Sequence, residues 1–258
     1  MTNEQEAKTP ERRWPQFSLR TLLVVMAVLA LLFSYLAIAI RQAHEAANRT
    51  TCHGRRVNML CMALQNYHDA FGCFPPAFVA DENGKPMHSW RVLLLPHLER
   101  QDLYRRYDFS EPWDGPNNRL LRKEMPEVFR CPSSHGQDPF STNYVAVVGS
   151  ETAWPGGKSV SHNDIIDGPS DTLLIVEVAD SDIDWMEPRD MTYSQAIAGV
   201  NVDRRHGISS DHPGGAICGM ADCHSIFLPD DVPPAAIKAL LTIHGDEPRE
   251  VLSTVLHR

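Results

Sequence analysis

The stretch LLVVMAVLALLFSYLAIAI, residues 22–40, determines how the rest of the chain is organised. Its nineteen residues are apolar except for Ser34 and the amphipathic Tyr35. With a rise of about 1.5 Å per residue, a helix of this length spans roughly 28 Å, which is close to the hydrocarbon thickness of a bilayer. The sequence therefore predicts a transmembrane helix over residues 17–41, behind a polar and disordered lead of residues 1–16.

Three kinds of segment share this apolar composition. A buried core helix is disfavoured because the stretch is apolar on every side rather than along one stripe. A cleaved secretory signal is suggested by the small-x-small pattern at Ala37–Ala39, but the apolar region of such signals is usually only about 7–15 residues long. We therefore expect a retained signal-anchor. Basic residues flank both of its ends, so the long C-terminal domain, residues 42–245, decides the orientation: lead in the cytoplasm, domain outside.

The residues after this stretch continue the helix with a different pattern. No proline occurs between Arg41 and Phe71. One face carries residues at i, i+3 and i+4 spacing: Val57, Leu60, Cys61, Leu64, His68 and Phe71. Gly54 is a weak point, because glycine costs about 1 kcal/mol against alanine inside a helix, and Pro75–Pro76 lies beyond the end of the pattern. The sequence thus predicts one long helix, apolar all round in its first half and amphipathic in its second.

Strand patterns dominate the second part of the chain. TNYVAVVG (residues 142–149) and TLLIVEV (172–178) are rich in β-branched residues and bounded by turn formers. GGAICGMADCHSIFL (214–228) predicts a hairpin, and residues 233–243 predict a short helix before a polar tail, residues 246–258. A helix followed by a mostly antiparallel sheet indicates an α+β fold, with the long N-terminal helix packed on the sheet.

The predicted hairpin has an unusual turn. We expect it to turn at Asp222–Cys223, which places Met220 opposite Ser225 and Cys218 opposite Phe227. The centre of a two-residue turn needs positive φ, which an Asp-Gly pair adopts easily. A cysteine there costs about 1 kcal/mol, unless the turn has another form or the thiol has a use.

Composition excludes several classes of function. The formal net charge is −9 and the basic residues form no stripe, so nucleic acid is not an expected partner. Six cysteines could form disulfides in an oxidising exterior, and no Cys-x-x-Cys pair indicates a zinc ribbon or a thioredoxin-type site. The sequence has no nucleophile elbow, phosphate-binding glycine loop or His-Glu-x-x-His motif. We therefore expect no catalytic residue, no cofactor and no enzymatic activity.

The C-terminal region concentrates side chains that could bind a metal ion. The candidates are His206, His212, Asp222, Cys223 and His224. Zinc favours such nitrogen and sulfur ligands. However, Cys218 and Cys223 are an odd number of residues apart and would point to opposite faces of a regular hairpin. A structural role, with His212 fixing a loop and Asp222 fixing the turn, is the favoured interpretation.

A second group of acidic residues resembles the opening of a calcium loop. It comprises Asp180, Asp182, Asp184 and Glu187. The group fails the EF-hand pattern, because Trp185 stands at the glycine position and Met191 at the position of the last glutamate. A solvated acidic loop is the expected structure.

Several segments resemble known bacterial proteins. A long helix with an anchoring half and a sheet-bearing half is similar to type IV pilins and type II secretion pseudopilins. Five segments resemble the bacterial domain-of-unknown-function family 1559: RTTCHGRRVNMLCMALQNYHDAFGCFPPA (49–77), WRVLLLPHLE (90–99), FRCPS (129–133), TNYVAVVG (142–149) and EVADSDIDWMEPRD (177–190). His212 and Asp222 stand at the spacing of the family's C-terminal His-x9-Asp-Gly signature, described as associated with prepilin-type processing. The resemblance implies a pseudopilin-like fold.

The chain also departs from that family. Gln16 precedes the aromatic Phe17, where processed prepilins have glycine, and Thr21 stands where the glutamate of the mature chain belongs. Cys223 replaces the signature glycine. The first two changes favour an anchor that is neither cleaved nor polymerised. The resemblance places cysteines at Cys52 and Cys131, which implies a disulfide from helix to sheet if the domain is extracytoplasmic.

These features together predict a single-span membrane protein with a structural or interaction role at the cell envelope. The bilayer, other envelope proteins and pseudopilins are its expected partners. One alternative is a subunit of a pilus or a type II secretion apparatus. Another is a metal-dependent envelope enzyme that uses the C-terminal histidines, aspartates and cysteines.

Overall fold

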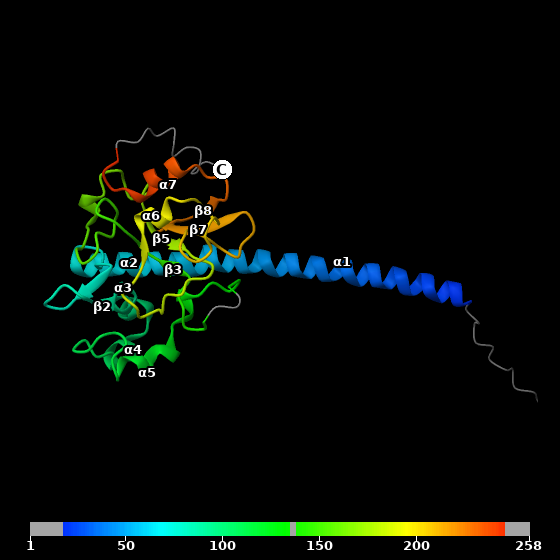
Figure 1. Cartoon of the computed structure of the whole chain (residues 1–258), viewed down its shortest axis with the longest axis horizontal. Coiled ribbons are helices and arrows are strands. Elements are labelled where there is room, and N and C mark those ends of the chain that lie inside the picture. Colours follow the sequence, from blue (N-terminus) through cyan, green and yellow to red (C-terminus); the bar gives the residue numbers. More distant parts are fainter. Residues whose placement is uncertain (1–17, 135–137, 246–258) are drawn as a thin grey trace, which may run out of the picture. The chain divides into compact units, whose positions relative to one another are not determined.

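The computed structural model describes residues 18–134 and 138–245, without the side chains of residues 51–54. The predicted lead, residues 1–16, and the predicted tail, residues 246–258, lie outside the described residues. The chain divides into two units, residues 1–44 and residues 45–258, and each is described by itself. Figure 1 shows the helices and strands in chain order.

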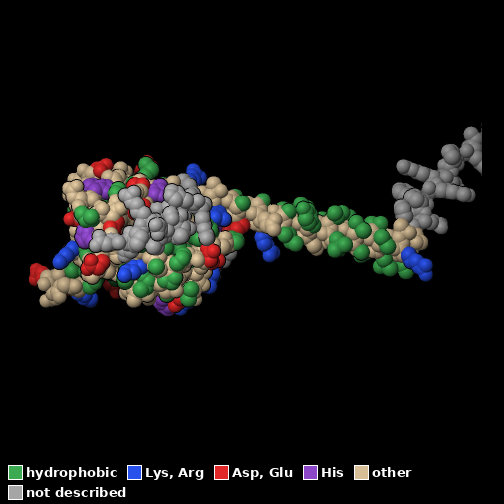
Figure 2. Space-filling model, turned by 90° about the horizontal axis from the view of Figure 1, so that it is seen from above, with side chains coloured by type: hydrophobic (Ala, Val, Ile, Leu, Met, Phe, Trp, Pro, Cys, Tyr) green, Lys and Arg blue, Asp and Glu red, His purple; other side chains and the backbone are tan. Residues whose placement is uncertain are grey.

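Helix α1 (Leu19–Thr51) contains the apolar stretch. Ser18 caps its start, since the Ser18 hydroxyl accepts the Thr21 N–H at 3.2 Å. The helical stretch from Leu19 to Phe71 contains an 18-residue window of mean hydropathy 2.8, none of which is buried. Figure 2 shows hydrophobic side chains over the surface of this helix. The expectation of an apolar N-terminal helix long enough to cross a membrane is confirmed, and its exposure does not fit a core helix.

The helical path changes at the predicted weak point. A π-helical segment, η1 (Cys52–Val57), surrounds Gly54 and leads into α2 (Asn58–Phe71). Helix α2 buries one face, with Leu60 and Leu64 completely inaccessible to solvent. It ends at Gly72, whose φ of 77° lets its N–H bond to the His68 carbonyl at 2.7 Å. The predicted amphipathic half of the helix is therefore confirmed from Val57 to Leu64, whereas Phe71, at the end of the predicted face, is 63% exposed.

A four-stranded antiparallel sheet forms the centre of the domain. Its strands follow the order β3 (Tyr144–Val145), β5 (Leu173–Glu177), β7 (Gly215–Met220) and β8 (Ser225–Pro229). Two smaller pairs flank it. Strand β1 (Phe78–Ala80) is antiparallel to β2 (Pro86–Ser89), and β4 (Val147–Val148) is parallel to β6 (Met191–Thr192). The predicted α+β class with a mostly antiparallel sheet is confirmed.

Each face of the central sheet buries its own apolar core. Ile175 and Ile217 face the core shared with η1 and α2. Val176 and Cys218 face the second core, which α7 (Pro234–Leu241) covers (Figure 1). Gly219 lies where the helix packs against β7, because a Cβ atom there would collide with the Cys61 sulfur. Alternate side chains of one strand thus support two different layers.

Short helices connect these strands. They are α3 (Trp90–Leu93), η2 (Leu95–Leu98), α4 (Gln101–Arg106), α5 (Asn118–Leu121), η3 (Arg122–Glu124), η4 (Glu127–Phe129), η5 (His162–Asp164) and α6 (Tyr193–Ala196). Pro96 lies in η2, between α3 and α4, where a proline cannot continue an α-helix.

A buried ion pair divides one predicted strand into two. The carboxylate of Asp190 accepts the Ala146 N–H at 2.8 Å and the Trp90 indole N–H at 3.1 Å, and it pairs with the guanidinium of Arg91. Because the Ala146 N–H bonds to a side chain, residues 142–149 do not form one continuous ladder. Strand β3 pairs with β5 before that point, and β4 pairs with β6 after it.

The hairpin of β7 and β8 is one residue out of its predicted register. Cys218 lies opposite Ile226 rather than the residue after it. The chain reverses through a turn from Met220 to Cys223, closed by the Cys223 N–H on the Met220 carbonyl at 3.1 Å. Cys223 has a φ of 74°, whereas Asp222 does not adopt positive φ. The turn is thus longer than the predicted two-residue turn, and Cys223 occupies the left-handed position that follows it.

Candidate functional site

The five C-terminal metal candidates lie in separate places. His206 is exposed and its Nδ1 lies 3.3 Å from the carboxylate of Asp203. Asp222 and His224 pair with each other at the hairpin turn. His212 is buried at the opposite end of β7. The structure therefore does not bring the predicted set, which also includes Cys223, into one site.

Asp222 holds the hairpin turn in shape. Its backbone N–H bonds to the Pro169 carbonyl at 3.0 Å, and its carboxylate accepts the His224 N–H at 3.2 Å. The adjacent Cys223 donates its thiol to the Cys61 carbonyl at 3.4 Å. This end of the signature thus has the structural role that the sequence favours.

His212, at the other end of the signature, is the centre of a buried cluster. Its Nε2 lies 3.4 Å from the Cys131 sulfur and 3.8 Å from Oε1 of Glu177. Its Nδ1 lies 2.6 Å from Oε1 of Glu45. Among the side chains that the structure describes, Cys131, Glu177 and His212 are the one group of three with metal-binding atoms close together, all within 4.8 Å of one another.

Four segments of the domain position these side chains. Glu45 lies near the end of α1, Cys131 follows η4, Glu177 ends β5 and His212 precedes β7. The backbone is anchored at each side: the Cys131 N–H bonds to the side chain of Asn143 at 2.9 Å. The His212 N–H bonds to the Ser210 hydroxyl at 3.1 Å, and the carboxylate of Glu177 accepts the Ile217 N–H at 3.1 Å. The cluster is preorganised by the fold around it.

The cluster contains more acidic groups than basic ones. Burial raises the pKa of Glu177, because a charged carboxylate loses its hydration there. Burial also favours the neutral form of His212, but Cys131, Glu177 and Glu45 outweigh it and raise the pKa of His212 to about 9. Three acidic side chains thus surround a single imidazole. Such an arrangement favours a positive charge at its centre.

Sequence reasoning missed Glu177 and Glu45 as partners of His212. Glu177 did give a signal, because a glutamate inside the apolar run TLLIVEV must be either buried with a partner or misplaced. Glu45 gave a weaker sequence signal, since acidic residues are common on exposed helices. The contacts depend on a tertiary arrangement over 167 residues between Glu45 and His212, which no local pattern reveals.

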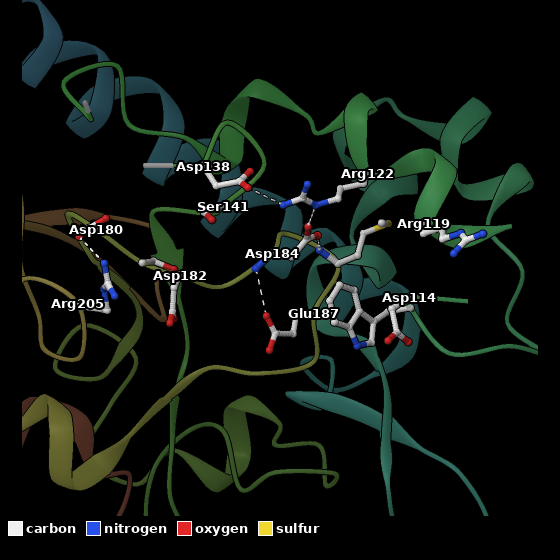
Figure 3. Close-up of a pocket in the computed structure, with 13 residues that line it drawn as sticks. Asp114, Arg119, Arg122, Asp138, Ser141, Asp180, Asp182, Asp184, Glu187 and Arg205 are labelled. Carbon is white, nitrogen blue, oxygen red and sulfur yellow. Dashed lines mark hydrogen bonds and ion pairs between the residues drawn. The ribbon is translucent and has the colours of Figure 1, made fainter. Parts of the chain in front are cut away.

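A separate surface pocket contains the predicted calcium residues. It has a volume of about 650 Å³ and is shown in Figure 3. Its lining includes Asp180, Asp182, Asp184 and Glu187, together with Arg122 and Arg205. The acidic run therefore does form part of a cavity, which the sequence did not predict.

The acidic groups of this pocket form ion pairs with arginines. Arg122 bonds to Asp138 at 2.9 Å and also pairs with Asp184 (Figure 3). Arg205 lies 3.2 Å from Asp180, and Arg189 bonds to Asp182 at 2.8 Å and to Glu187 at 2.6 Å. These arginines compete with any cation for the carboxylates.

The calcium-loop pattern also fails at its centre. Trp185, at the glycine position, is completely buried, stacks on Phe129 and donates its indole N–H to the Arg122 carbonyl at 3.0 Å. The hydrogen bond from Arg189 lowers the pKa of Asp182, whereas burial raises the pKa of Asp184. The predicted solvated loop is thus only partly correct: Asp180 and Asp182 keep 42% and 48% of their side chains exposed, whereas Asp184 and Glu187 are largely buried in the ion-pair network.

The proposed Cys52–Cys131 disulfide involves a side chain outside the described part of the chain, that of Cys52. The Cys131 sulfur lies against His212 at 3.4 Å. The pairing stays a prediction.

Comparison with known proteins gives one family. Residues 41–163 match the family described as "Protein of unknown function (DUF1559)". This match confirms the family resemblance for the four segments that lie within it, whereas residues 177–190 and the signature residues His212 and Asp222 lie outside the matched range. No curated protein and no solved structure matches the chain.

Proposed function

Since residues 41–163 match the family of unknown function DUF1559, we propose that the chain is a membrane-anchored protein of the cell envelope. Its apolar helix crosses the bilayer once, with the N-terminus in the cytoplasm. Residues 45–245 form a domain outside the cytoplasm that acts by binding other envelope components.

The exposed helix is the observation that carries this proposal. Large apolar side chains along it, such as Leu31 and Phe33, are about two-thirds or more exposed, at 72% and 68%. In water this surface would be unfavourable at about 25 cal/mol for each Å² of apolar area. A bilayer removes that cost, and the hydropathy of the helix is high enough for a single span.

A binding role fits the domain better than catalysis. Cys131 and His212, the strongest candidates for nucleophile and base, are each only 2% exposed, so a substrate would not reach them. The pocket of Figure 3, by contrast, is open and lined with charged groups that suit a polar partner.

A pseudopilin-like build is supported by the long helix that packs its second half on an antiparallel sheet. The N-terminal residues of the helix do not favour assembly into a filament. The hydroxyl of Thr21, at the position of the pilin glutamate, lies 2.8 Å from that of Ser18 and offers no charge to a neighbouring subunit. We propose a pseudopilin-like anchor that does not polymerise.

Protease treatment of spheroplasts and lysed cells tests the topology. The proposal expects protease to digest the domain in intact spheroplasts while a cytoplasmic marker survives. A control variant, Leu29→Arg with Leu32→Arg, should lose membrane attachment, since an arginine at the centre of a span costs about 2.5–3.5 kcal/mol. Protection of the domain until lysis would overturn the orientation. Recovery of the protein in sheared filaments would overturn the non-polymerising role.

A further inference from the structure

The cluster around His212 has the composition and geometry of a metal centre. We propose that Cys131, Glu177 and His212 bind one Zn²⁺ ion. This inference is independent of membrane topology, and it replaces the C-terminal group of candidates with a set drawn from three distant segments.

The separations between the side-chain atoms suit tetrahedral zinc. With Zn–S of about 2.3 Å and Zn–N and Zn–O of about 2.1 Å, tetrahedral ligand atoms lie about 3.6 Å apart for S to N and about 3.4 Å apart for N to O. In the cluster, the sulfur of Cys131 is 3.4 Å and the Oε1 of Glu177 3.8 Å from Nε2 of His212. Both of these separations lie within a few tenths of an ångström of the tetrahedral values, and the third, from the Cys131 sulfur to the Glu177 carboxylate, is at most 4.8 Å.

Glu45 supplies the partner that a zinc-binding histidine usually has. Such a histidine donates its second ring N–H to a carboxylate, which fixes the tautomer and orients the ring. Oε1 of Glu45 lies 2.6 Å from Nδ1 of His212, on the side of the ring away from Cys131. The other oxygen of Glu45 accepts the Ser133 hydroxyl at 3.0 Å. The arrangement directs the free Nε2 at the Cys131 sulfur and the Glu177 carboxylate.

Charge balance points the same way. A thiolate, a carboxylate and a neutral imidazole together carry two negative charges, which Zn²⁺ neutralises. Without an ion, the buried carboxylate of Glu177 lies 3.8 Å from Nε2 of His212, whose other ring nitrogen already pairs with the carboxylate of Glu45. Burying unbalanced charge is costly, and binding a divalent cation relieves that cost.

The site would also tie the domain together. Its residues come from the segment after η4, the end of β5 and the segment before β7, and the carboxylate that orients His212 comes from α1. A bound ion would thus link the end of the long helix to the two central strands. Three protein ligands are the number found in zinc sites that complete their coordination with water.

Metal titration of the reduced, detergent-solubilised full chain tests the proposal. After removal of metal, Zn²⁺ should bind with one equivalent per chain, measured by competition with a chromophoric chelator. Co²⁺ should give a thiolate-to-metal charge-transfer band, because one ligand is a cysteine. Zn²⁺ binding should release protons, since the thiol and the imidazole must deprotonate.

Substitutions locate the ion. Cys131→Ser and His212→Gln should each weaken Zn²⁺ binding by about 100-fold or more, and Glu45→Gln by about 10–100-fold. Cys73→Ser and His206→Gln are matched controls outside the cluster and should bind as the wild type does. Circular dichroism checks that each variant folds, and the Co²⁺ spectrum of the wild type remains decisive if a variant does not.

Two results would overturn the site. One is the absence of stoichiometric binding, or of the charge-transfer band, in the wild type. The other is loss of binding in the Cys73 or His206 control with retention in folded Cys131→Ser. The contacts around His212 would then be a hydrogen-bonded structural cluster. Neither result bears on the membrane topology.

Discussion

Two buried clusters of charged residues in this domain differ in how completely they are balanced. In the first, Asp190 faces Arg91, so one negative group meets one positive group. In the second, His212 faces Glu45, Glu177 and Cys131. The first is completely buried, and in the second only Glu45 reaches solvent, with 29% of its side chain exposed. Both join segments far apart in the sequence.

Hydrogen bonding sharpens the contrast. The guanidinium of Arg91 also bonds to the Tyr144 carbonyl at 3.2 Å and to the Ser89 hydroxyl at 3.0 Å. Asp190 receives two further N–H groups besides the guanidinium. This cluster is closed, with charge and hydrogen bonds satisfied by the protein itself. The His212 cluster has a surplus of acidic groups, which a cation would complete. The Arg91–Asp190 pair therefore has a structural role, whereas the surplus of acidic groups around His212 is the charge that the proposed Zn²⁺ ion would balance.

Removing the anion of the closed cluster should have the largest effect. Asp190→Ala leaves Arg91 buried without its partner, and we expect a loss of about 3–5 kcal/mol in the free energy of unfolding. Denaturant titration measures it. Asp182→Ala breaks a surface pair with Arg189 and should cost about 1 kcal/mol or less. Equal losses in the two variants would show that the buried pair is not a closed structural unit.

The charge on His212 should make stability depend on pH in the metal-free protein. Folding raises the pKa of His212 from its ordinary value of 6.5 to about 9. The stability from this charged imidazole is thus fully present below about pH 6.5 and is lost as the pH rises through about 9. The difference in unfolding free energy between wild type and His212→Gln should fall across this window, by at most about 3 kcal/mol.

The matched control for this pH effect is His206→Gln, at an exposed position. Denaturant titrations at several pH values measure both differences. A wild-type advantage that grows from pH 6.5 to pH 9 would contradict the sign of the effect.

Zinc should stabilise the unbalanced cluster and leave the closed one unaffected. At a free concentration one hundred times its dissociation constant, an ion that binds only the folded state adds about 2.7 kcal/mol to the unfolding free energy. We expect this gain in the wild type and in Cys73→Ser but not in Cys131→Ser. A gain of the same size in Cys131→Ser would place the ion elsewhere.

The disulfide predicted between Cys52 and Cys131 competes with this ion, because one sulfur cannot serve both. Zinc stabilisation should therefore depend on prior reduction if that disulfide forms. Alkylation and mass spectrometry of the unreduced chain identify the state of Cys131.

The sequence predicted the helices and strands, which depend on neighbouring residues, better than the cluster around His212. Apolar periodicity identified α1 and α2, and Gly54 marked the π-helical segment between them. These features depend on residues three or four apart. Strand patterns located β5 and β7, but a hairpin register depends on the turn, and Cys223 at positive φ shifted it by one residue.

The site residues were harder because contact between distant segments has no periodic signature. His212 was identified for its signature and its chemistry, yet its partners come from residues 45, 131 and 177. The sequence grouped it with Asp222 and His224, which are near in sequence but lie beyond β7. Glu177 within a buried strand was the signal available, and it identifies one member of the cluster rather than the whole.

The smallest expected change in stability concerns Cys223, at the hairpin turn that ends the family signature. Cys223 adopts a φ of 74°, which glycine tolerates better than cysteine. Cys223→Gly should therefore raise the free energy of unfolding by about 1 kcal/mol. The loss of the hydrogen bond from the Cys223 thiol to the Cys61 carbonyl reduces this gain. Glu99 has a φ of 58° without such a contact, and Glu99→Gly measures the backbone gain by itself. Thermal unfolding compares the two variants.

Comparing Cys223→Gly with His212→Gln also distinguishes a structural role from a role in metal binding at the two ends of β7. If Asp222 and Cys223 only shape a turn, Cys223→Gly should leave Zn²⁺ affinity unchanged, whereas His212→Gln should weaken it by about 100-fold or more. A drop in melting temperature with Cys223→Gly would show instead that the thiol holds the turn against the helix. A drop in zinc affinity with Cys223→Gly would show that the hairpin turn also contributes to the metal site. The unbalanced cluster would then extend over both ends of β7.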